Sequence, residues 1–360
     1  VLMQRIALIY GGESSEHSVS CVTALGVFTA IDSTKYEVIP IGITKTGRFV
    51  LEPVNQEWRL EDFPEVSEDS PELLLPLGGG ELRMTSGISL GKIHLAFPVL
   101  HGPNGEDGSI QGLLQLCKIP YVGNGVMASA LAMDKVQAKA LFRDVGLEVA
   151  SEQVITRDQW ADSKSTCLSR AKKILKPDAF VKPSRSGSSV GVSLVLKEKD
   201  LEAAIELALS HDQTAMVERR VLGREIECSV LEMPNGDLQV SKAGEILVTG
   251  RPFYDYEAKY LGAGAELVIP AKLTAKDASA LVKAATAAFR ALGCKGLART
   301  DFFLTKKGWV ITEVNTMPGF TPISMYPALF EASGINYQDL VEILIQNGFG
   351  EQELTEEAAD

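Results

Sequence analysis

The chain has 360 residues, which corresponds to two or three domains at about 150 residues each. Hydrophobic residues make up 45% of it and charged residues 23%, so collagen, a coiled coil and a wholly disordered chain are excluded as descriptions of the whole. The net charge is −12 and no basic stripe is present, so we expect no nucleic-acid partner.

Membrane insertion and export are also not expected. The longest uncharged stretch, Ile119–Met133, is interrupted by proline and glycine and is too short to span a bilayer. The first strand-like segment follows the N-terminus directly, without the pattern of a signal peptide. The five cysteines are scattered and form no CxxC or Cys/His cluster. We therefore predict buried, unpaired thiols in a reducing cytoplasm, and no zinc site.

The first third of the chain alternates strand-like and helix-like segments. Arg5–Tyr10, Tyr36–Ile43 and Ile93–Leu100 are predicted strands, and a helix from the Gly-Gly turn to about Ala30 follows the first of them. Glu52–Gly80 is rich in proline, acids and glycine and predicts a long loop. Helical spacing then appears at Ile110, Leu113, Leu114 and Cys117. This order favours a parallel sheet with helical crossovers, an α/β fold.

The remaining chain begins with a predicted linking helix, Asp134–Gly146. Short strands are then predicted at Phe180–Pro183, Val190–Leu196, Met216–Val221 and Glu225–Glu232. An alanine-rich helix, Asp277–Leu292, precedes a final hairpin of two strands, Leu297–Thr305 and Trp309–Asn315.

The final hairpin carries a candidate metal site. Side chains alternate along a strand, so Arg299 and Asp301 share one face, as do Glu313 and Asn315. The short turn places Asp301 almost opposite Glu313. Two carboxylates and an amide oxygen suit Mg²⁺, which takes further ligands from substrate phosphates. The alternative is an ordinary solvent-facing side of a hairpin.

Three other segments carry weaker signals for nucleotide chemistry. The small polar loop Lys182–Gly191 could hold phosphates with its backbone N–H groups and its lysine, or be a plain hairpin loop. Glu218–Val221, followed by Glu225, could bind an adenine edge and a ribose, or be an exposed strand. Phe253–Tyr260 mixes aromatic and charged residues and could be a functional lid or a surface loop.

Taken in order, these segments resemble the ATP-grasp enzymes and, within them, the D-alanine–D-alanine ligases, from Arg5 to about Gly348. The segments that carry the resemblance are Gly11–Ser20, His101–Gly108, Gly125–Lys135, Lys182–Gly191, Tyr254–Tyr260 and Glu313–Gly319. The resemblance implies an ATP-grasp fold with an N-terminal parallel-sheet domain at 1–133. It also implies a central subdomain at 134–222 and a C-terminal domain with lid and metal site at 223–360.

The resemblance implies an activity as well. The family joins two D-alanines, converts ATP to ADP and phosphate through an acyl phosphate, and so supplies peptidoglycan precursors. ATP would be a substrate, two Mg²⁺ (or Mn²⁺) ions would be the cofactors, and the chain would be a cytoplasmic homodimer.

Residue by residue, the resemblance implies the following roles. The metal ligands would be Asp301, Glu313 and Asn315. The nucleotide would be bound by Lys135, Lys182, Glu218, Val221, Glu225, Phe253, Lys259 and Phe303. Glu16 would bind the ammonium of the first D-alanine, with Ser188 and Tyr260 completing a triad that holds the lid.

The resemblance also implies the remaining catalytic roles. Arg299 and the backbone N–H of Gly319 would stabilise the oxyanion, and Ser324 would bind the carboxylate of the second D-alanine. His101 would lie in the pocket, or be a structural histidine. Tyr260 favours a dipeptide over an ester product.

Two residues depart from the family pattern, and two other functions are disfavoured. Ser186 and Arg220 depart from residues common in relatives, without removing a catalytic group. A nucleotide-binding oxidoreductase is disfavoured because no Gly-x-Gly-x-x-Gly follows Tyr10. A non-catalytic ATP-binding regulator is disfavoured because Arg299 and the three candidate metal ligands are all present.

Overall fold

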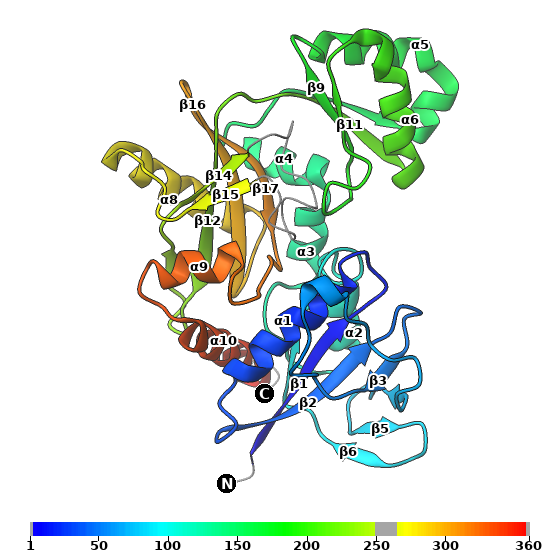
Figure 1. Ribbon diagram of the computed structural model, residues 1–360, viewed down its shortest axis with the longest axis vertical. Coiled ribbons are helices and arrows are strands. Elements are labelled where there is room, and N and C mark those ends of the chain that lie inside the picture. The colour runs from blue at the N-terminus through cyan, green and yellow to red at the C-terminus, as the bar shows by residue number, and fades with distance from the viewer. Residues whose placement is uncertain (1–2, 249–264, 358–360) are drawn as a thin grey trace.

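The structure is a computed structural model in which residues 3–248 and 265–357 are described. The predicted lid, Phe253–Tyr260, lies outside these residues. Figure 1 shows three lobes. The N-terminal strands lie at one end, and the central lobe, named for its place in the middle of the sequence, lies at the other end. The C-terminal sheet lies between these two ends.

The N-terminal lobe contains a four-stranded sheet in the order β3-β2-β1-β7. Strand β1 lies inside this sheet and is parallel to β2 and β7. Its residues Ile6 to Tyr10 are at most 1% exposed, as expected for a central parallel strand. The elements are β1 (Gln4–Gly11), α1 (His17–Ala30), β2 (Tyr36–Ile43), β3 (Phe49–Leu51), β7 (Leu95–Pro98) and α2 (Ser109–Leu116). The three predicted strands are parallel neighbours, as expected, although β7 is shorter than the predicted 93–100. Strand β3 pairs with β2 in the antiparallel direction.

The predicted loop at 52–80 contains some regular structure. A short 3-10 helix forms at Leu60–Asp62, and β4 forms at Leu73–Leu74. Strand β4 belongs to a small antiparallel sheet with β5 (Leu82–Met84) and β6 (Ser89–Gly91), which follow the predicted loop. These strands are only two or three residues long, too short to show a clear alternating pattern in the sequence.

The central lobe is an antiparallel sheet in the order β10-β9-β11-β8. Its elements are β8 (Glu152–Thr156), α5 (Arg157–Ile174), β9 (Ala179–Pro183), β10 (Ser193–Val195), a 3-10 turn (Glu198–Asp200), α6 (Leu201–His211) and β11 (Thr214–Arg219). Helices α5 and α6 were not predicted. Helix α6 nevertheless buries residues at helical spacing, Leu201, Ala204, Ile205, Ala208 and Leu209.

The C-terminal sheet has the order β15-β14-β12-β16-β17, with β13 paired to β12. Its strands are β12 (Arg224–Glu232), β13 (Leu238–Val240), β14 (Gly244–Val248), β15 (Ala265–Val268), β16 (Leu297–Thr305) and β17 (Gly308–Asn315). The helices around it are α3 (Val126–Met133), α4 (Lys135–Asp144), α8 (Ala275–Ala291) and α9 (Met325–Glu331). Ala138 and Phe142 of α4 share one buried core with Phe289 of α8 and Ile311 of β17, so α4 is anchored to this sheet.

The last helix, α10 (Tyr337–Glu357), returns to the N-terminal lobe and lies near α1 in Figure 1. Its Leu340 and Leu344 share a hydrophobic core with Ile6 and Leu8 of β1. This contact joins the two ends of the chain and fixes the N-terminal lobe relative to the C-terminal sheet.

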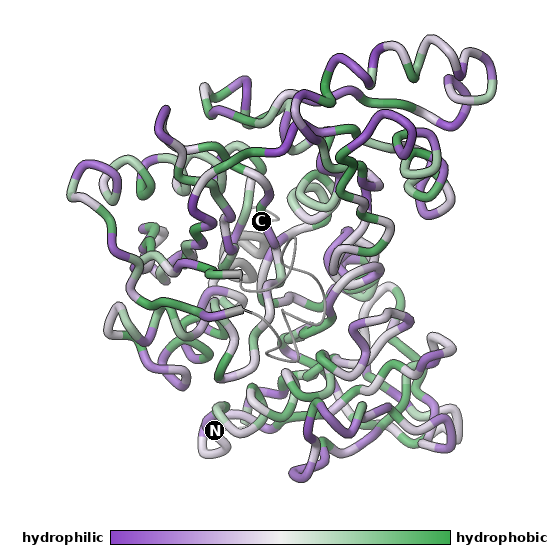
Figure 2. Tube along the Cα trace, turned by 45° about the horizontal axis from the view of Figure 1, so that its top comes forward, coloured by the Kyte–Doolittle hydropathy of each residue, from purple (hydrophilic) through white to green (hydrophobic). Residues whose placement is uncertain are grey.

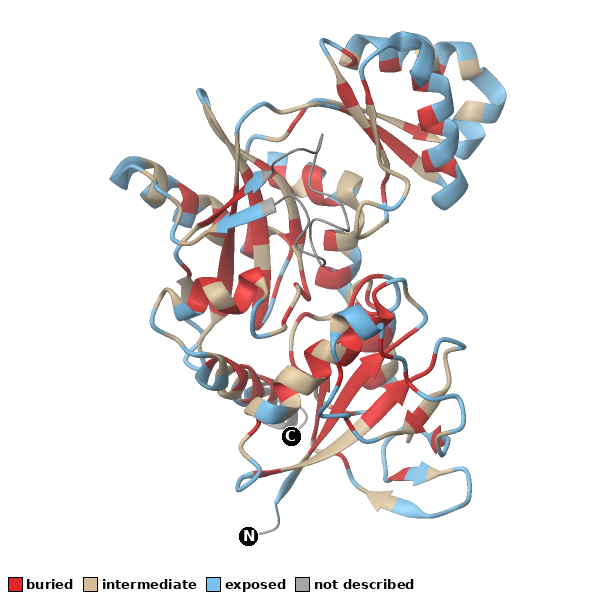
Figure 3. Ribbon diagram, viewed as in Figure 1, coloured by how far each residue is buried: buried red, intermediate tan, exposed pale blue. Residues whose placement is uncertain are grey.

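Burial follows the expected pattern. Figure 3 shows buried residues along the strands and the inward sides of the helices, and Figure 2 shows hydrophobic residues on the same segments. All five cysteines are buried and free. Among the helices of the described ranges, none is both long and apolar enough to cross a membrane.

Candidate active site

The hairpin of β16 and β17 has the predicted register. Asp301 lies opposite Glu313, and Arg299 lies opposite Asn315. On the other side of β16, Glu227 of β12 also lies opposite Asp301. The carboxylates of Glu227, Asp301 and Glu313 therefore lie in one row across three neighbouring strands. Their negative charges repel one another unless cations lie beside them.

Arg299 supplies one of those cations. Its Nε and Nη2 each donate to Asp301 at 2.8 Å, and its Nε lies 3.0 Å from Glu227 Oε2. Only 13% of the Arg299 side chain is exposed. Burial lowers the pKa of this guanidinium, but the carboxylates of Asp301 and Glu227 outweigh it and raise the pKa well above its ordinary value. A fixed positive charge therefore stands beside the carboxylate row.

The donor set on this hairpin fits Mg²⁺. Asp301 and Glu313 offer carboxylate oxygens across the ladder, and the Asn315 amide lies close enough to donate to Asp301 Oδ2 at 3.0 Å. Within the described ranges, no three His, Cys, Asp or Glu side chains form a group that could hold a metal alone. Two carboxylates and an amide oxygen match a cation that keeps water and substrate oxygens as its other ligands.

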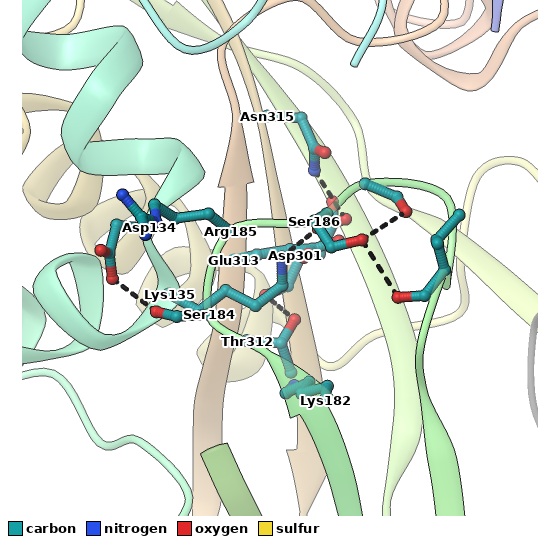
Figure 4. Close-up of polar contacts among 12 residues, drawn as sticks. Asp134, Lys135, Lys182, Ser184, Arg185, Ser186, Asp301, Thr312, Glu313 and Asn315 are labelled. Atoms are coloured by element: carbon teal, nitrogen blue, oxygen red, sulfur yellow. Dashed lines mark hydrogen bonds and ion pairs between the residues drawn. The ribbon is translucent and has the colours of Figure 1, made fainter. Parts of the chain in front are cut away.

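The start of α4 is fastened to the serine-rich loop that follows β9. Asp134 caps the helix by accepting hydrogen bonds from backbone N–H groups of its first turn, and it accepts another from Ser184 Oγ at 2.6 Å. Lys135 Nζ donates to the carbonyl of Ser186 at 2.7 Å and lies 3.7 Å from Glu313 Oε2 (Figure 4). The capped helix therefore places Lys135 between the loop and the carboxylate row.

A second lysine comes from β9. Lys182 Nζ lies 2.8 Å from Glu218 Oε1 of β11. Burial raises the pKa of Glu218, but Lys182 and Lys139 outweigh it and lower the pKa to about 2. Burial likewise opposes the charge on Lys182, yet Glu218 raises its pKa above the ordinary value. Both groups are therefore ionised at neutral pH.

Glu16 lies where three loops meet. It is the residue before α1, and its side chain is buried. A methyl group added to Gly102 would lie 2.6 Å from Glu16 Oε2, and one added to Gly187 would lie 3.5 Å from it. Gly102 N–H donates to Glu106 Oε1 at 2.8 Å. Burial, followed by the Glu16 carboxylate, raises the pKa of Glu106 to about 8, so Glu106 carries a proton at neutral pH.

His101 uses both of its ring nitrogens within the protein. Nδ1 lies 3.2 Å from the carbonyl oxygen of Met317, and Nε2 lies 2.9 Å from Thr23 Oγ1. A carbonyl can only accept, so Nδ1 carries the proton and Nε2 of the neutral ring accepts from the hydroxyl. Burial lowers the pKa of His101, which favours this neutral form. The ring thus connects α1 to the loop that leads to Gly319.

Gly319 and Ser324 lie together at the start of α9. A methyl group on Gly319 would lie 3.2 Å from Ser324 Oγ. That hydroxyl oxygen also accepts the backbone N–H of Thr321 at 3.1 Å.

These groups surround one cavity of about 360 Å³. The candidate residues that line it are Glu16, His101, Lys135, Lys182, Ser188, Glu218, Glu225, Arg299, Asp301, Phe303, Glu313, Asn315, Gly319 and Ser324. Val221 is not among the described residues that line the cavity. Phe253, Lys259 and Tyr260 lie outside the described residues.

Comparison with known families decides the classification. Residues 5–124 match the family described as D-ala D-ala ligase N-terminus, and residues 141–346 match D-ala D-ala ligase C-terminus. The chain belongs to the D-alanine–D-alanine ligase family. Its relatives with that name include one from Mycolicibacterium vanbaalenii, 47% identical, and one from Mycobacterium tuberculosis, 45% identical. These matches cover 95% of this chain and 96% and 94% of the two relatives.

Solved structures place this ligase-family chain in the ATP-grasp fold. The VanG D-Ala:D-Ser ligase from Enterococcus faecalis superposes with a TM-score of 0.85 at 35% identity, covering 97% of this chain and all of that one. The D-alanine–D-alanine ligase from Coxiella burnetii gives 0.83 at 30% identity, with 100% and 97% coverage. The predicted family and fold are confirmed.

Three charged residues of this ligase-family chain were not predicted from the sequence: Glu106 and Glu227, which line the cavity, and Lys139, which contacts Glu218. Glu227 was detectable, because it lies two residues after Glu225 and so shares its face of β12. Lys139 was detectable only as a residue one helical turn after Lys135. Glu106 lies in a loop with no periodic pattern.

Proposed function

We propose that this chain joins two D-alanines into D-alanyl-D-alanine, converts ATP to ADP and phosphate, and thereby supplies a peptidoglycan precursor. The observation that carries the proposal is the single cavity onto which Glu16, Lys135, Lys182 and the Asp301–Glu313 pair converge. It supplies a carboxylate for an ammonium group, two cations for phosphates and a set of oxygens for a divalent cation. Family membership supports the same reaction.

The first step is phosphoryl transfer from ATP to the carboxylate of the first D-alanine. Glu16 holds the ammonium of that substrate, and Lys135 and Lys182 hold the phosphates in line with the attacking oxygen. Asp301, Glu313 and Asn315 would hold two Mg²⁺ (or Mn²⁺) ions, which when bound neutralise charge on the phosphate oxygens.

The second step is acyl transfer. The neutral amine of the second D-alanine attacks the acyl phosphate and a C–N bond forms. The C–O bond breaks, and phosphate leaves with its electrons and takes the proton that the nitrogen loses. Arg299 and the N–H of Gly319 stabilise the negative oxygen of the tetrahedral intermediate. Ser324 holds the carboxylate of the second D-alanine, and His101 keeps the loop that carries Gly319 in place.

The adenosine part and the lid complete the proposal. Glu218, Val221 and Glu225 hold the adenine and ribose, and Phe253 and Phe303 contact the ring. Ser188 and Tyr260 form a triad with Glu16 that holds the lid over the substrate, and Lys259 reaches the γ-phosphate.

The cellular location, the oligomeric state and the domain bounds are also proposed. ATP as a substrate and five unpaired thiols support a cytoplasmic enzyme. The family resemblance supports a homodimer, which light scattering coupled to size-exclusion chromatography would measure. It also supports domains at 1–133, 134–222 and 223–360.

The proposal is tested by ADP release with Mg–ATP, followed by mass spectrometry of the product. Amino-acid mixtures would be D-alanine alone, D-alanine with D-serine, D-alanine with D-lactate, and L-alanine. We expect ADP and D-alanyl-D-alanine from D-alanine alone. Product only from a mixed pair would overturn the proposed specificity and keep the mechanism. No ADP from any mixture, with folded protein, would overturn the proposed function.

A further inference from the structure

Helix α4 carries three basic residues at four-residue spacing: Lys135, Lys139 and Arg143. This spacing puts them on one side of the helix. Lys135 reaches the cavity, and the Arg143 side chain at the other end is 44% exposed. Lys139, between them, has only 1% of its side chain exposed, and it is not among the described residues that line the cavity. A buried ammonium requires compensation by the groups around it.

Those groups belong mainly to the central sheet. Glu152 of β8 lies directly opposite Glu218 of β11, so two carboxylates share one face of neighbouring strands. Like charges in that position repel each other. Lys139 Nζ forms an ion pair with Glu218 Oε2, lies 3.3 Å from Glu152 Oε2, and lies 3.2 Å from the carbonyl oxygen of Ala150. An ammonium has three N–H donors, so these contacts can use all of them.

The second oxygen of Glu218 faces the nucleotide cavity. Oε1 lies 2.8 Å from Lys182 Nζ, while Oε2 is the oxygen that contacts Lys139. Glu218 therefore bridges two lysines, one buried behind it and one lining the cavity. Without the rear lysine, Glu218 would be repelled by Glu152 and held by Lys182 alone, which would draw Lys182 away from a phosphate ligand.

We propose that Lys139 is a positioning residue for the nucleotide: it holds Glu218 in place and, through Glu218, directs Lys182 toward the phosphates. The inference rests on the proposed use of ATP in this cavity. It assigns a function to a residue that is not among the described residues lining the cavity. Removal of Lys139 therefore weakens phosphate binding and leaves the D-alanine subsites unchanged.

The test must separate positioning from folding, because Lys139→Met alone leaves two buried carboxylates poorly compensated. The double variant K139M/E152Q removes one positive and one negative charge together. Glu152→Gln alone is the matched control, because it keeps the Lys139–Glu218 pair. Arg143→Met is a second control on the same side of α4, since it removes only a contact to Glu152.

The readout is the Kd of Mg–ADP by isothermal titration calorimetry without D-alanine, together with KM for ATP and for D-alanine. We expect K139M/E152Q to bind Mg–ADP about tenfold more weakly and to raise KM for ATP by a similar factor. KM for D-alanine should stay within about twofold of the wild type. The two controls should retain wild-type nucleotide affinity.

A third comparison tests the route through Glu218. In a Glu218→Gln background, adding K139M/E152Q should change the Kd of Mg–ADP by less than about twofold, because the side chain at position 218, through which Lys139 acts, is already neutral.

Wild-type nucleotide affinity in folded K139M/E152Q would overturn the inference, as would an equal loss of affinity in the E152Q control. If the wild type binds Mg–ADP but forms no dipeptide, only the proposed reaction fails; if it binds no Mg–ADP, both fail.

Discussion

Arg299 and Asp301 form a two-point contact on one face of β16: Nε donates to Oδ1 and Nη2 to Oδ2, both at 2.8 Å. The planar guanidinium matches a carboxylate in a way that a lysine ammonium does not. The same guanidinium lies against Glu227, so one cation compensates two buried carboxylates. Its charge is therefore fixed both in position and in protonation.

The first prediction follows from that contact. Arg299→Lys keeps a positive charge but loses the two-point geometry. We therefore expect kcat for ADP release to fall by roughly 100-fold or more, as for loss of an oxyanion donor, which is the role proposed for Arg299. Lys295→Met changes an exposed lysine on the same stretch of chain, 4.0 Å from Glu232, and should leave kcat unchanged. Steady-state kinetics of both variants test whether Arg299 takes part in the reaction. Equal kcat for R299K and wild type would show that it does not.

The second prediction concerns the close approach of Gly102 to Glu16. Gly102 has φ of +75°, and a methyl group there would lie 2.6 Å from the Glu16 carboxylate oxygen. Gly102→Ala should therefore displace Glu16 and raise KM for D-alanine about tenfold or more, besides destabilising the fold by about 1–3 kcal/mol. KM for ATP should change much less.

The matched control for this variant is Gly236→Ala. Gly236 has φ of +82°, but no atom lies within 4 Å of an added methyl group. It therefore imposes the same kind of backbone strain without touching the site. If Gly236→Ala raises KM for D-alanine as much as Gly102→Ala does, strain alone explains the effect.

The third prediction is a pH dependence of stability at His101. Burial lowers the pKa of this ring in the folded protein, while the unfolded chain binds a proton near the ordinary value of 6.5. Below about pH 6.5 the unfolded state thus binds more protons, and stability falls as the pH falls. Above that pH the ring is neutral in both states and contributes no slope.

His101→Gln should remove this slope. Urea unfolding at a series of pH values from 7.5 to about 5 would show the free energy of unfolding of wild type falling relative to that of the variant below pH 6.5. A constant difference across the series would mean that the folded ring titrates normally. Because the ring links Thr23 to Met317, the variant should also lose stability at pH 7.5, by about 1–3 kcal/mol.

Sequence alone could predict the register of the candidate metal-binding hairpin because the information is local. A short turn fixes the register of β16 and β17, and strand alternation then places Asp301 opposite Glu313. The environment of Lys139 could not be predicted in the same way. Its burial depends on Glu152 and Glu218, which meet only after β8 and β11 pair. A lysine one turn after another on a helix otherwise indicates a solvated face.

Long-range contacts limited the prediction elsewhere. His101 bonds Thr23 and Met317, which are distant from it in the sequence, so its partners could not be inferred from spacing. Helix α5 was missed because only Cys167 and Ala171 of its residues are buried, which leaves a weak helical pattern. The lysine at the start of α4, by contrast, was found through its motif, and its support by Asp134 became visible only in the structure.

The last prediction tests that support. Asp134 accepts hydrogen bonds from the N–H groups of Val136 and Gln137 at 3.1 and 3.2 Å, and from Ser184 Oγ at 2.6 Å. Asp134→Ala removes the cap and the link to the serine-rich loop together. We expect a loss of about 0.5–2 kcal/mol in the free energy of unfolding, typical of a lost cap. Lys135 should also be displaced, so KM for ATP should rise several-fold.

Thr274→Ala separates the two effects. Thr274 caps α8 by accepting the N–H of Asp277 at 3.1 Å, and it is not among the described residues that line the cavity. It should therefore cost similar stability while leaving KM for ATP unchanged. If both variants lose the same stability and both keep the wild-type KM, then Asp134 stabilises the helix without positioning Lys135. If only Asp134→Ala raises KM, the capped start of α4 is part of the nucleotide site.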